Sequence, residues 1–219
     1  GPKCVKAIFF VLNLDKFSFI SWKLKWKFFF LLFWLHSIIA RSVPLERLIK
    51  FLQNSESLLR LYPEPESDSL RKVIAKRFAM KSEQVFIGNG SDEVLSLCFL
   101  AFFADRGSLS FPELTYSFYP SIAKLFKIPF STFRLKKDFS LDLTDVDPDS
   151  KSVIFPNPNA ITGIGLSIDA IDRFVRENPD KLIIIDEAYA DFSKSSCIPL
   201  INNYSNILVI QTFSKSRGL

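Results

Sequence analysis

The stretch LIIIDEAY, residues 182–189, places an unbroken run of apolar residues directly before two carboxylates. A short strand that is apolar throughout is typical of a sheet covered by helices on both faces. Similar short runs recur along the chain and predict strands at 84–87, 108–111, 131–135, 152–155 and 207–211. Segments of helical period alternate with them, at 44–59, 68–78, 92–103, 116–126 and 168–176. The alternation predicts an α/β fold, a mainly parallel sheet with helices on both faces.

The composition and charge argue against several classes of function. With 219 residues, 48% of them hydrophobic, the chain is large enough to bury a substantial core. The formal net charge of +5 comes mainly from residues 1–50, where Asp15 and Glu46 are the only acids. The later charges are mixed and form no basic stripe, so we expect no nucleic-acid partner. Three scattered cysteines and a single histidine exclude most zinc sites and a Ser-His-Asp triad, so we expect no metal and a cytoplasmic location.

Residues 1–43 form a hydrophobic and basic segment unlike the rest of the chain, which we assign to one domain over 44–219. The apolar run KFFFLLFWLHSIIA, residues 27–40, is shorter than the roughly 20 residues of a spanning helix. Three interpretations remain: a signal-like segment, an interfacial anchor carrying Trp22, Trp26 and Trp34, or an apolar arm packing on a partner or on the domain. The arm is favoured because the following residues resemble a cytosolic enzyme, so membrane contact of residues 7–40 is not favoured.

Polar loops follow four of the expected strands. They are GNGSDE (88–93), PNPNAITG (156–163), DEAY (186–189) and TFSK (212–215). Ligands of a parallel sheet bind at the carboxyl ends of its strands, so these loops should meet at one edge.

Each loop suits a particular chemistry. Gly88 and Gly90 allow the backbone to approach a phosphate, and Ser91 and Asp92 begin a helix whose free N–H groups attract an anion. An ordinary helix cap would look the same. Asp186 suits a protonated ring nitrogen, although strand-end acids are common. Partial desolvation of Lys215 would lower its pKa and give a nucleophilic amine, whereas a lone surface lysine would have no such role.

Together, LYPEP (61–65), GNGSDE (88–93), TYSFY (115–119), NPNAITG (157–163), IIIDEAYADF (183–192) and TFSKSRGL (212–219) resemble the fold-type I, class I/II pyridoxal-phosphate-dependent aminotransferases. The resemblance is greatest to the histidinol-phosphate aminotransferase branch and covers about residues 44–219. It implies the large, cofactor-binding domain of such an enzyme. It also implies pyridoxal 5'-phosphate as cofactor, a small amino donor and a 2-oxo acid as substrates, and a homodimer.

The resemblance also implies catalytic roles. Lys215 would form the Schiff base with the cofactor and move a proton at the substrate α-carbon. Asp186 would pair with the ring nitrogen. Tyr189 would donate to the phenolic oxygen, and Tyr116 would stack on the ring.

Other residues would hold the cofactor phosphate. The resemblance assigns this role to the loop at Gly90, to the backbone of Ser91 and Asp92, and to the hydroxyl of Ser214. Tyr62 would reach the phosphate bound by the neighbouring subunit of a dimer.

The chain departs from the family in two places. The family usually reads NPNNPTG, and Ala160 and Ile161 replace its second Asn-Pro, so Asn157 or Asn159 would have to take over a contact with the phenolic oxygen. The chain ends at Leu219, where family members continue into a small C-terminal domain. We therefore expect a chain truncated after the Schiff-base lysine and inactive by itself.

Three functions remain open from the sequence. The first is amino transfer between histidinol phosphate and 2-oxoglutarate, in histidine biosynthesis. The second is another fold-type I reaction, that of an amino-acid aminotransferase or of a threonine-phosphate decarboxylase. The third is a degenerate, non-enzymatic relative with a membrane- or partner-binding N-terminus.

Overall fold

A computed structural model describes residues 7–11, 64–104, 107–193 and 195–215. Within these residues seven strands form one sheet in the order β2-β1-β7-β6-β5-β3-β4. Every strand pair in it is parallel. The predicted α/β class is confirmed.

The strands are β1 (Ala7–Val11), β2 (Val85–Gly88), β3 (Leu109–Pro112), β4 (Phe130–Phe133), β5 (Ser152–Pro156), β6 (Leu182–Asp186) and β7 (Ile207–Ile210). The α-helices are α3 (Asp68–Arg77), α4 (Ser91–Cys98), α5 (Phe118–Leu125) and α6 (Ile168–Glu177). Short helical turns are η3 (Ser82–Gln84), η4 (Phe99–Phe103), η5 (Leu143–Asp145), η6 (Ala190–Phe192) and η7 (Ile198–Asn202). The predicted helix at 44–59 lies outside the described residues.

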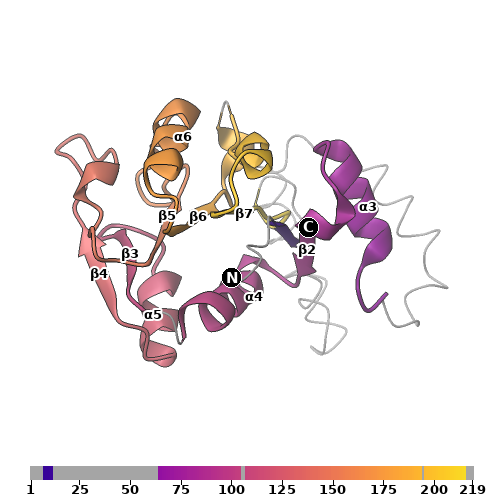
Figure 1. The fold of residues 1–219 in the computed structure, drawn as a ribbon, viewed down its shortest axis with the longest axis horizontal. Helices are drawn as coiled ribbons and strands as arrows, with labels where there is room; N and C mark the ends of the chain where they lie inside the picture. The colour runs from indigo at the N-terminus through magenta and orange to yellow at the C-terminus, as the bar shows by residue number, and fades with distance from the viewer. Residues whose placement is uncertain (1–6, 12–63, 105–106, 194, 216–219) are drawn as a thin grey trace, which may run out of the picture.

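Helices cover both faces of the sheet. Figure 1 shows α3 and α6 on one side, and α4 and α5 on the other. Alternate residues of the central strands therefore enter two different cores. In β6, Ile183 and Ile185 pack with α6 and η7, whereas Ile184 packs with α4 and α5. This arrangement explains why the run LIII is apolar at every position, because neither face of the strand meets solvent.

The strand β1 was not predicted. Residues 7–11 were assigned to the N-terminal segment, yet their backbone pairs with β2 on one side and with β7 on the other. These five residues therefore belong to the sheet. The remaining residues of the segment, with its tryptophans and the apolar run 27–40, lie outside the described part. Among the described residues, no helix has the length and apolar character needed to cross a bilayer.

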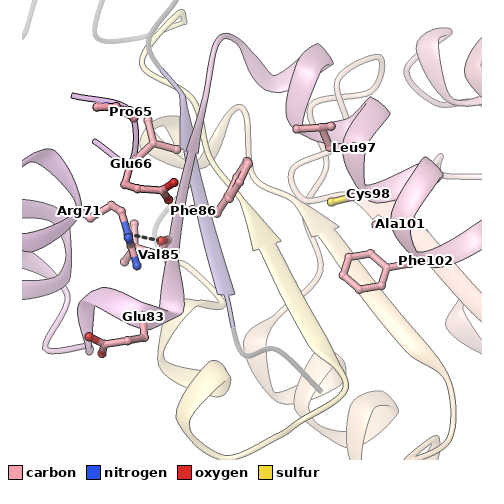
Figure 2. A pocket seen from close by; sticks show the side chains of 11 residues that line it. Pro65, Glu66, Arg71, Glu83, Val85, Phe86, Leu97, Cys98, Ala101 and Phe102 are labelled. Carbon is pink, nitrogen blue, oxygen red and sulfur yellow. Dashed lines mark hydrogen bonds between the residues drawn. The ribbon is translucent and has the colours of Figure 1, made fainter. Parts of the chain in front are cut away.

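A cavity of about 520 Å³ lies beside β2 (Figure 2). Its walls come from β2, from the C-terminal half of α4 with η4, and from Arg71 of α3. Phe86, Leu97 and Phe102 make much of the lining apolar. The cavity includes none of the predicted site residues.

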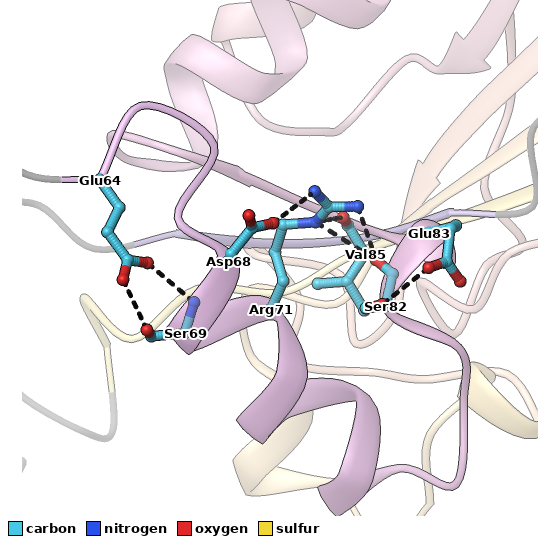
Figure 3. Close-up of polar contacts among 7 residues, drawn as sticks. All are labelled: Glu64, Asp68, Ser69, Arg71, Ser82, Glu83 and Val85. Atoms are coloured by element: carbon cyan, nitrogen blue, oxygen red, sulfur yellow. Dashed lines mark hydrogen bonds and ion pairs between the residues drawn. The ribbon is translucent and has the colours of Figure 1, made fainter.

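Arg71 fastens α3 to the sheet (Figure 3). Its Nε donates to the carbonyl oxygen of Val85 at 2.9 Å, and its Nη2 donates to that of Ser82 at 2.9 Å. At the start of the same helix, the Glu64 carboxylate accepts hydrogen bonds from the backbone N and the hydroxyl of Ser69. These bonds satisfy groups that helix ends and strand ends would otherwise leave unpaired.

Candidate functional site

The carboxyl ends of the parallel strands meet at one edge of the sheet, as predicted. The last residue of β6, Asp186, is in register with Pro156 of β5 and with Ile210 of β7. The loops that follow these three strands are therefore neighbours. They begin with Asn157, Glu187 and Gln211.

Asp186 is a buried carboxylate at this edge of the sheet, with 4% of its surface exposed. Its Oδ1 accepts a hydrogen bond from the backbone N of Ala188 at 3.0 Å, and its Oδ2 accepts one from the hydroxyl of Tyr119 at 2.6 Å. Burial raises the pKa of this carboxyl, while the two hydrogen bonds and the nearby charge of Lys215 oppose the rise. A carboxylate has about four acceptor positions, so Asp186 retains capacity for another donor.

Tyr119 was missed by the sequence analysis. The motif TYSFY was quoted for Tyr116 alone, and a tyrosine in an apolar helix suggests only core packing. In the structure Tyr119 is fully buried on α5, and its hydroxyl reaches the carboxylate of Asp186. Only the tertiary packing of α5 against β6 brings the two residues together, since they are 67 positions apart.

The turn from β2 into α4 requires glycine at two positions. A Cβ on Gly88 would lie 2.7 Å from the Cγ2 of Val94, and Gly90 has a φ of 90°. Gly90 is the N-cap of α4, and the carboxylate of Glu93 accepts a hydrogen bond from the backbone N of Asn89. The helix begins at Ser91, as predicted, so its first-turn amides point out of the N-terminus toward the site edge.

Asp92 and Tyr116 form a second tyrosine–carboxylate pair. The hydroxyl of Tyr116 lies 3.0 Å and 3.3 Å from the two carboxylate oxygens of Asp92. Burial and the charge of Asp92 raise the pKa of Tyr116 to about 12, so it remains a donor. The rings of Tyr116 and Tyr119 meet edge to face with centroids 5.9 Å apart, which places the two pairs side by side.

In the loop after β5, the side chains of Asn157 and Asn159 make hydrogen bonds to backbone groups. The Nδ2 of Asn159 donates to the carbonyl oxygen of Leu114, and its Oδ1 accepts from the backbone N of Ile161, both at 2.9 Å. The Oδ1 of Asn157 accepts from the backbone N of Leu166 at 2.7 Å. Asn159 therefore ties this loop to the one after β3, and both of its polar atoms have backbone partners.

Lys215 and Tyr189 approach each other at the end of β7. The Nζ of Lys215 lies 5.4 Å from the centroid of the Tyr189 ring, within the range of a cation–π contact. Ser214 donates its backbone N to the hydroxyl oxygen of Thr212 at 3.2 Å, and the two hydroxyls are 3.1 Å apart. Lys215 itself is exposed. The described residues therefore do not supply the partial desolvation that was expected for Lys215 from the sequence.

Glu187 is a second buried carboxylate at this edge, and three protein groups donate hydrogen bonds to it. Its oxygens accept from the hydroxyl of Ser196 and the backbone N of Cys197, each at 2.5 Å, and from the Nε2 of Gln211 at 2.8 Å. Burial raises its pKa, and these hydrogen bonds oppose the rise. Glu187 thus joins the segment before η7 to the end of β7.

The structure brings together most of the predicted residues. The β2–α4 turn, Tyr116, Asp186, Tyr189, Ser214 and Lys215 all follow strand ends of the same edge. Tyr62 lies outside the described residues. Within the described part of the chain, no group of three histidine, cysteine or acidic side chains is arranged to hold a metal ion.

Comparison with known proteins identifies the family of the chain. Residues 40–219 match the family model of class I and II aminotransferases. Over 177 residues the chain is 46% identical to a histidinol-phosphate aminotransferase of Clostridium botulinum, covering 80% of this chain and 50% of that protein. Over 164 residues it is 47% identical to histidinol-phosphate aminotransferase 1 of Bordetella parapertussis, covering 74% and 46%. The chain thus spans about half the length of the curated relatives it matches.

Solved structures agree in fold. A histidinol-phosphate aminotransferase of Sinorhizobium meliloti, solved with pyridoxal-5'-phosphate, superposes with a TM-score of 0.70 at 19% identity over 77% of this chain and 48% of that one. An L-threonine-O-3-phosphate decarboxylase of Porphyromonas gingivalis gives 0.70 at 22% identity over 77% and 54%. At such identities the likeness concerns the fold alone. The family model and the curated relatives carry the assignment further: the chain belongs to the class I and II aminotransferases.

Proposed function

We propose that the chain binds pyridoxal 5'-phosphate at this edge of the sheet. We further propose that the protein transfers an amino group between histidinol phosphate and 2-oxoglutarate. The observation that carries the proposal is the buried carboxylate of Asp186. It retains acceptor capacity and lies within electrostatic range of Asp92, in the first turn of α4, and of the amine of Lys215. The choice of substrates rests on the relatives named histidinol-phosphate aminotransferase.

The donors and acceptors present suit this cofactor. A buried carboxylate needs a cationic or hydrogen-bonding partner, and a protonated ring nitrogen supplies both. The first turn of α4, with Gly90 before it and Ser91 within it, offers N–H groups and a positive dipole end to a phosphate. The carboxylates of that turn are engaged elsewhere: Asp92 by Tyr116, and Glu93 by the backbone N of Asn89.

When bound, the cofactor supplies an electron sink for the substrate α-carbon. The protein groups do the rest. The amine of Lys215 would hold the cofactor and would move the proton at the substrate α-carbon. The carboxylate of Asp186 would hold a proton on the ring nitrogen. The hydroxyl of Tyr189 would donate to the phenolic oxygen. The ring of Tyr116 would pack on the cofactor, and the hydroxyl of Ser214 would help to hold its phosphate.

Asn157 and Asn159, the two candidates for a contact with the phenolic oxygen, differ in how far their side chains are already engaged by the protein. Both polar atoms of Asn159 bind backbone groups, which supports a role in loop structure instead. Asn157 is the other candidate, and its side chain also makes a hydrogen bond to Cys197. Its Oδ1 is already occupied by the backbone N of Leu166.

We also propose a homodimer in the cytoplasm, with a small amino donor and a 2-oxo acid as the other partners. The family resemblance supports the dimer, in which Tyr62 of one copy would serve the site of the other. Sedimentation velocity at micromolar concentration tests it.

The first prediction concerns Lys215. Borohydride reduction in the presence of pyridoxal phosphate should place the pyridoxyl label on Lys215, because its amine is the one that follows β7 at the site edge. Peptide mapping measures the position. Lys215→Ala should lose the label, whereas Lys124→Ala, an exposed lysine in the last turn of α5, should keep it. Label scattered over several lysines would contradict the assignment.

The choice of substrate is checked on the same loaded protein. Histidinol phosphate should change the absorption spectrum of the bound cofactor at concentrations where aspartate does not. An equal response to both amines would leave the cofactor site in place and refute the substrate.

A further inference from the structure

The hydroxyl of Tyr119 makes the shorter of the two hydrogen bonds to the carboxylate of Asp186. It lies 2.6 Å from Oδ2, against 3.0 Å for the backbone N of Ala188 at Oδ1. A separation of 2.6 Å is typical of a hydroxyl that donates to an ionised carboxylate. Tyr119 and Asp186 are both buried, with 0% and 4% of their surface exposed, so water does not compete for this bond.

We propose that Tyr119 is a positioning residue, which holds the carboxylate of Asp186 in one orientation and so strengthens its bond to the ring nitrogen of the cofactor. The proposal rests on the proposed function, because it assumes that Asp186 meets that nitrogen. The role differs from those implied by the family motifs, which concern residues that touch the cofactor themselves.

The two donors act on different oxygens, and this fixes the carboxylate. The backbone N of Ala188 binds Oδ1 from the same loop, and Tyr119 binds Oδ2 from α5 on the other side. With one bond alone, the carboxylate could rotate about its Cβ–Cγ bond. With both, rotation would break a hydrogen bond in a site that offers no water as a substitute, which costs free energy.

Tyr119 is itself held in place. Its ring meets Phe111 of β3 and Tyr116 edge to face, with centroids 6.2 Å and 5.9 Å apart. Burial, followed by the charge of Asp186, raises the pKa of Tyr119 well above its ordinary value, so its hydroxyl keeps its proton. The other charged groups that act on the pair are Asp92 and Lys215, and neither donates a hydrogen bond to Oδ2.

A purely structural role makes a different prediction. If the hydroxyl of Tyr119 only satisfies a polar atom in the core, Tyr119→Phe would lower stability and leave cofactor binding unchanged. If it positions Asp186, the same change weakens cofactor binding and alters the pH dependence of the bound cofactor. Tyr204→Phe is a matched control, because the Tyr204 hydroxyl also donates to a carboxylate, that of Asp172 in α6, at 2.7 Å.

The experiment titrates pyridoxal 5'-phosphate into the 219-residue chain and follows absorbance across pH. We expect Tyr119→Phe to raise the dissociation constant roughly tenfold, as expected for loss of a hydrogen bond to a charged group. The pH at which the bound cofactor changes its absorption should shift as well. Tyr204→Phe should change neither. In an Asp186→Asn background the effect of Tyr119→Phe should disappear, because the residue acts through Asp186.

Each other outcome counts against the proposal. A dissociation constant within about twofold of wild type with an unchanged pH profile refutes it, and so does an equal loss in the Asp186→Asn background. If Tyr119→Phe does not fold, 3-fluorotyrosine at position 119 keeps the shape and the hydroxyl with a more acidic phenol, and an unshifted pH profile then refutes it. Failure of the wild-type chain to bind the cofactor would overturn the proposed function itself, whereas normal wild-type binding with an indifferent variant overturns this inference alone.

Discussion

Asp186 and Glu187 are adjacent buried carboxylates that differ in the number of protein groups donating hydrogen bonds to them. Glu187 has three protein donors and faces the segment between η6 and β7. Asp186 has two donors and lies at the end of the central strand β6. A charged group in an apolar environment is stable only if its partners replace water. The difference in partner number therefore separates a carboxylate committed to structure from one available to a ligand.

This difference predicts the pH dependence of stability. Burial raises the pKa of Asp186 from 3.8 in the folded chain. Between 3.8 and the folded value, the native state binds more protons than the unfolded state, so stability falls as pH rises through this window. Urea unfolding of the cofactor-free chain should show that, as pH rises through this window, wild type loses stability relative to Asp186→Asn. The loss should reach up to about 1.4 kcal/mol per pH unit.

Asp138→Asn provides the opposite sign. Hydrogen bonds from Ser140 lower the pKa of the exposed Asp138, so its contribution is present above the ordinary value and is lost as pH falls. Relative to this variant, wild type should therefore gain stability as pH rises. A wild-type to Asp186→Asn difference that stays constant from pH 4 to 8 would show that Asp186 does not titrate with a raised pKa.

The sequence predicted which polar residues follow the strands, but not which groups these residues contact in the fold. Asp186 was placed correctly, because an acid after LIII must lie at a strand end. Tyr119 was not found, since its hydrogen bond depends on how α5 packs against β6. The exposure of Lys215 was likewise beyond the pattern, which fixes where a strand ends and leaves the path of the following loop open.

At the scale of elements, the predicted strands and helices that fall within the described residues agree with the structure to within about two residues. The apolar runs at 152–155 and 182–185 were clear because their length, bounded by polar residues, excludes a helix. The hydrogen bonds that join one loop to another could not be predicted in this way. Nothing in the sequence indicates that Asn159 would bind the carbonyl oxygen of Leu114, or that Glu187 would join two segments.

Glu187→Ala tests this joining role. The change leaves the hydroxyl of Ser196, the backbone N of Cys197 and the amide of Gln211 without their acceptor in a buried place. Unpaired buried donors cost about 1–3 kcal/mol each, partly relieved by water entering the space, so we expect a loss of roughly 2–4 kcal/mol in urea unfolding. Glu177→Ala, at the exposed end of α6, should change stability by less than about 0.5 kcal/mol. A loss equally small at Glu187 would mean that the segment before η7 holds without it.

At the scale of the whole molecule, the two-sided core was predictable and the composition of the sheet was not. Every expected strand was found, and each has apolar residues that enter one of two cores. Residues 7–11 show no strand pattern of their own, because AIFFV lies within a longer segment that is basic and apolar throughout. Pairing with β2 and β7, which are distant in sequence, places this stretch in the sheet.

Amide hydrogen exchange tests whether the N-terminal strand is part of the fold. In the structure β1 has a neighbour on each side, with Phe9 in register with both Phe86 and Ile210. Amides inside a sheet exchange only when the sheet opens, with free energies that approach that of global unfolding in core strands. The amides of residues 8–10 should therefore exchange about as slowly as those of β7, and more slowly than those of the loop 160–165. If they exchange like an unstructured peptide while β6 and β7 stay protected, β2 and β7 do not need β1 between them. The N-terminal segment would then be separate from the domain, as its composition suggested.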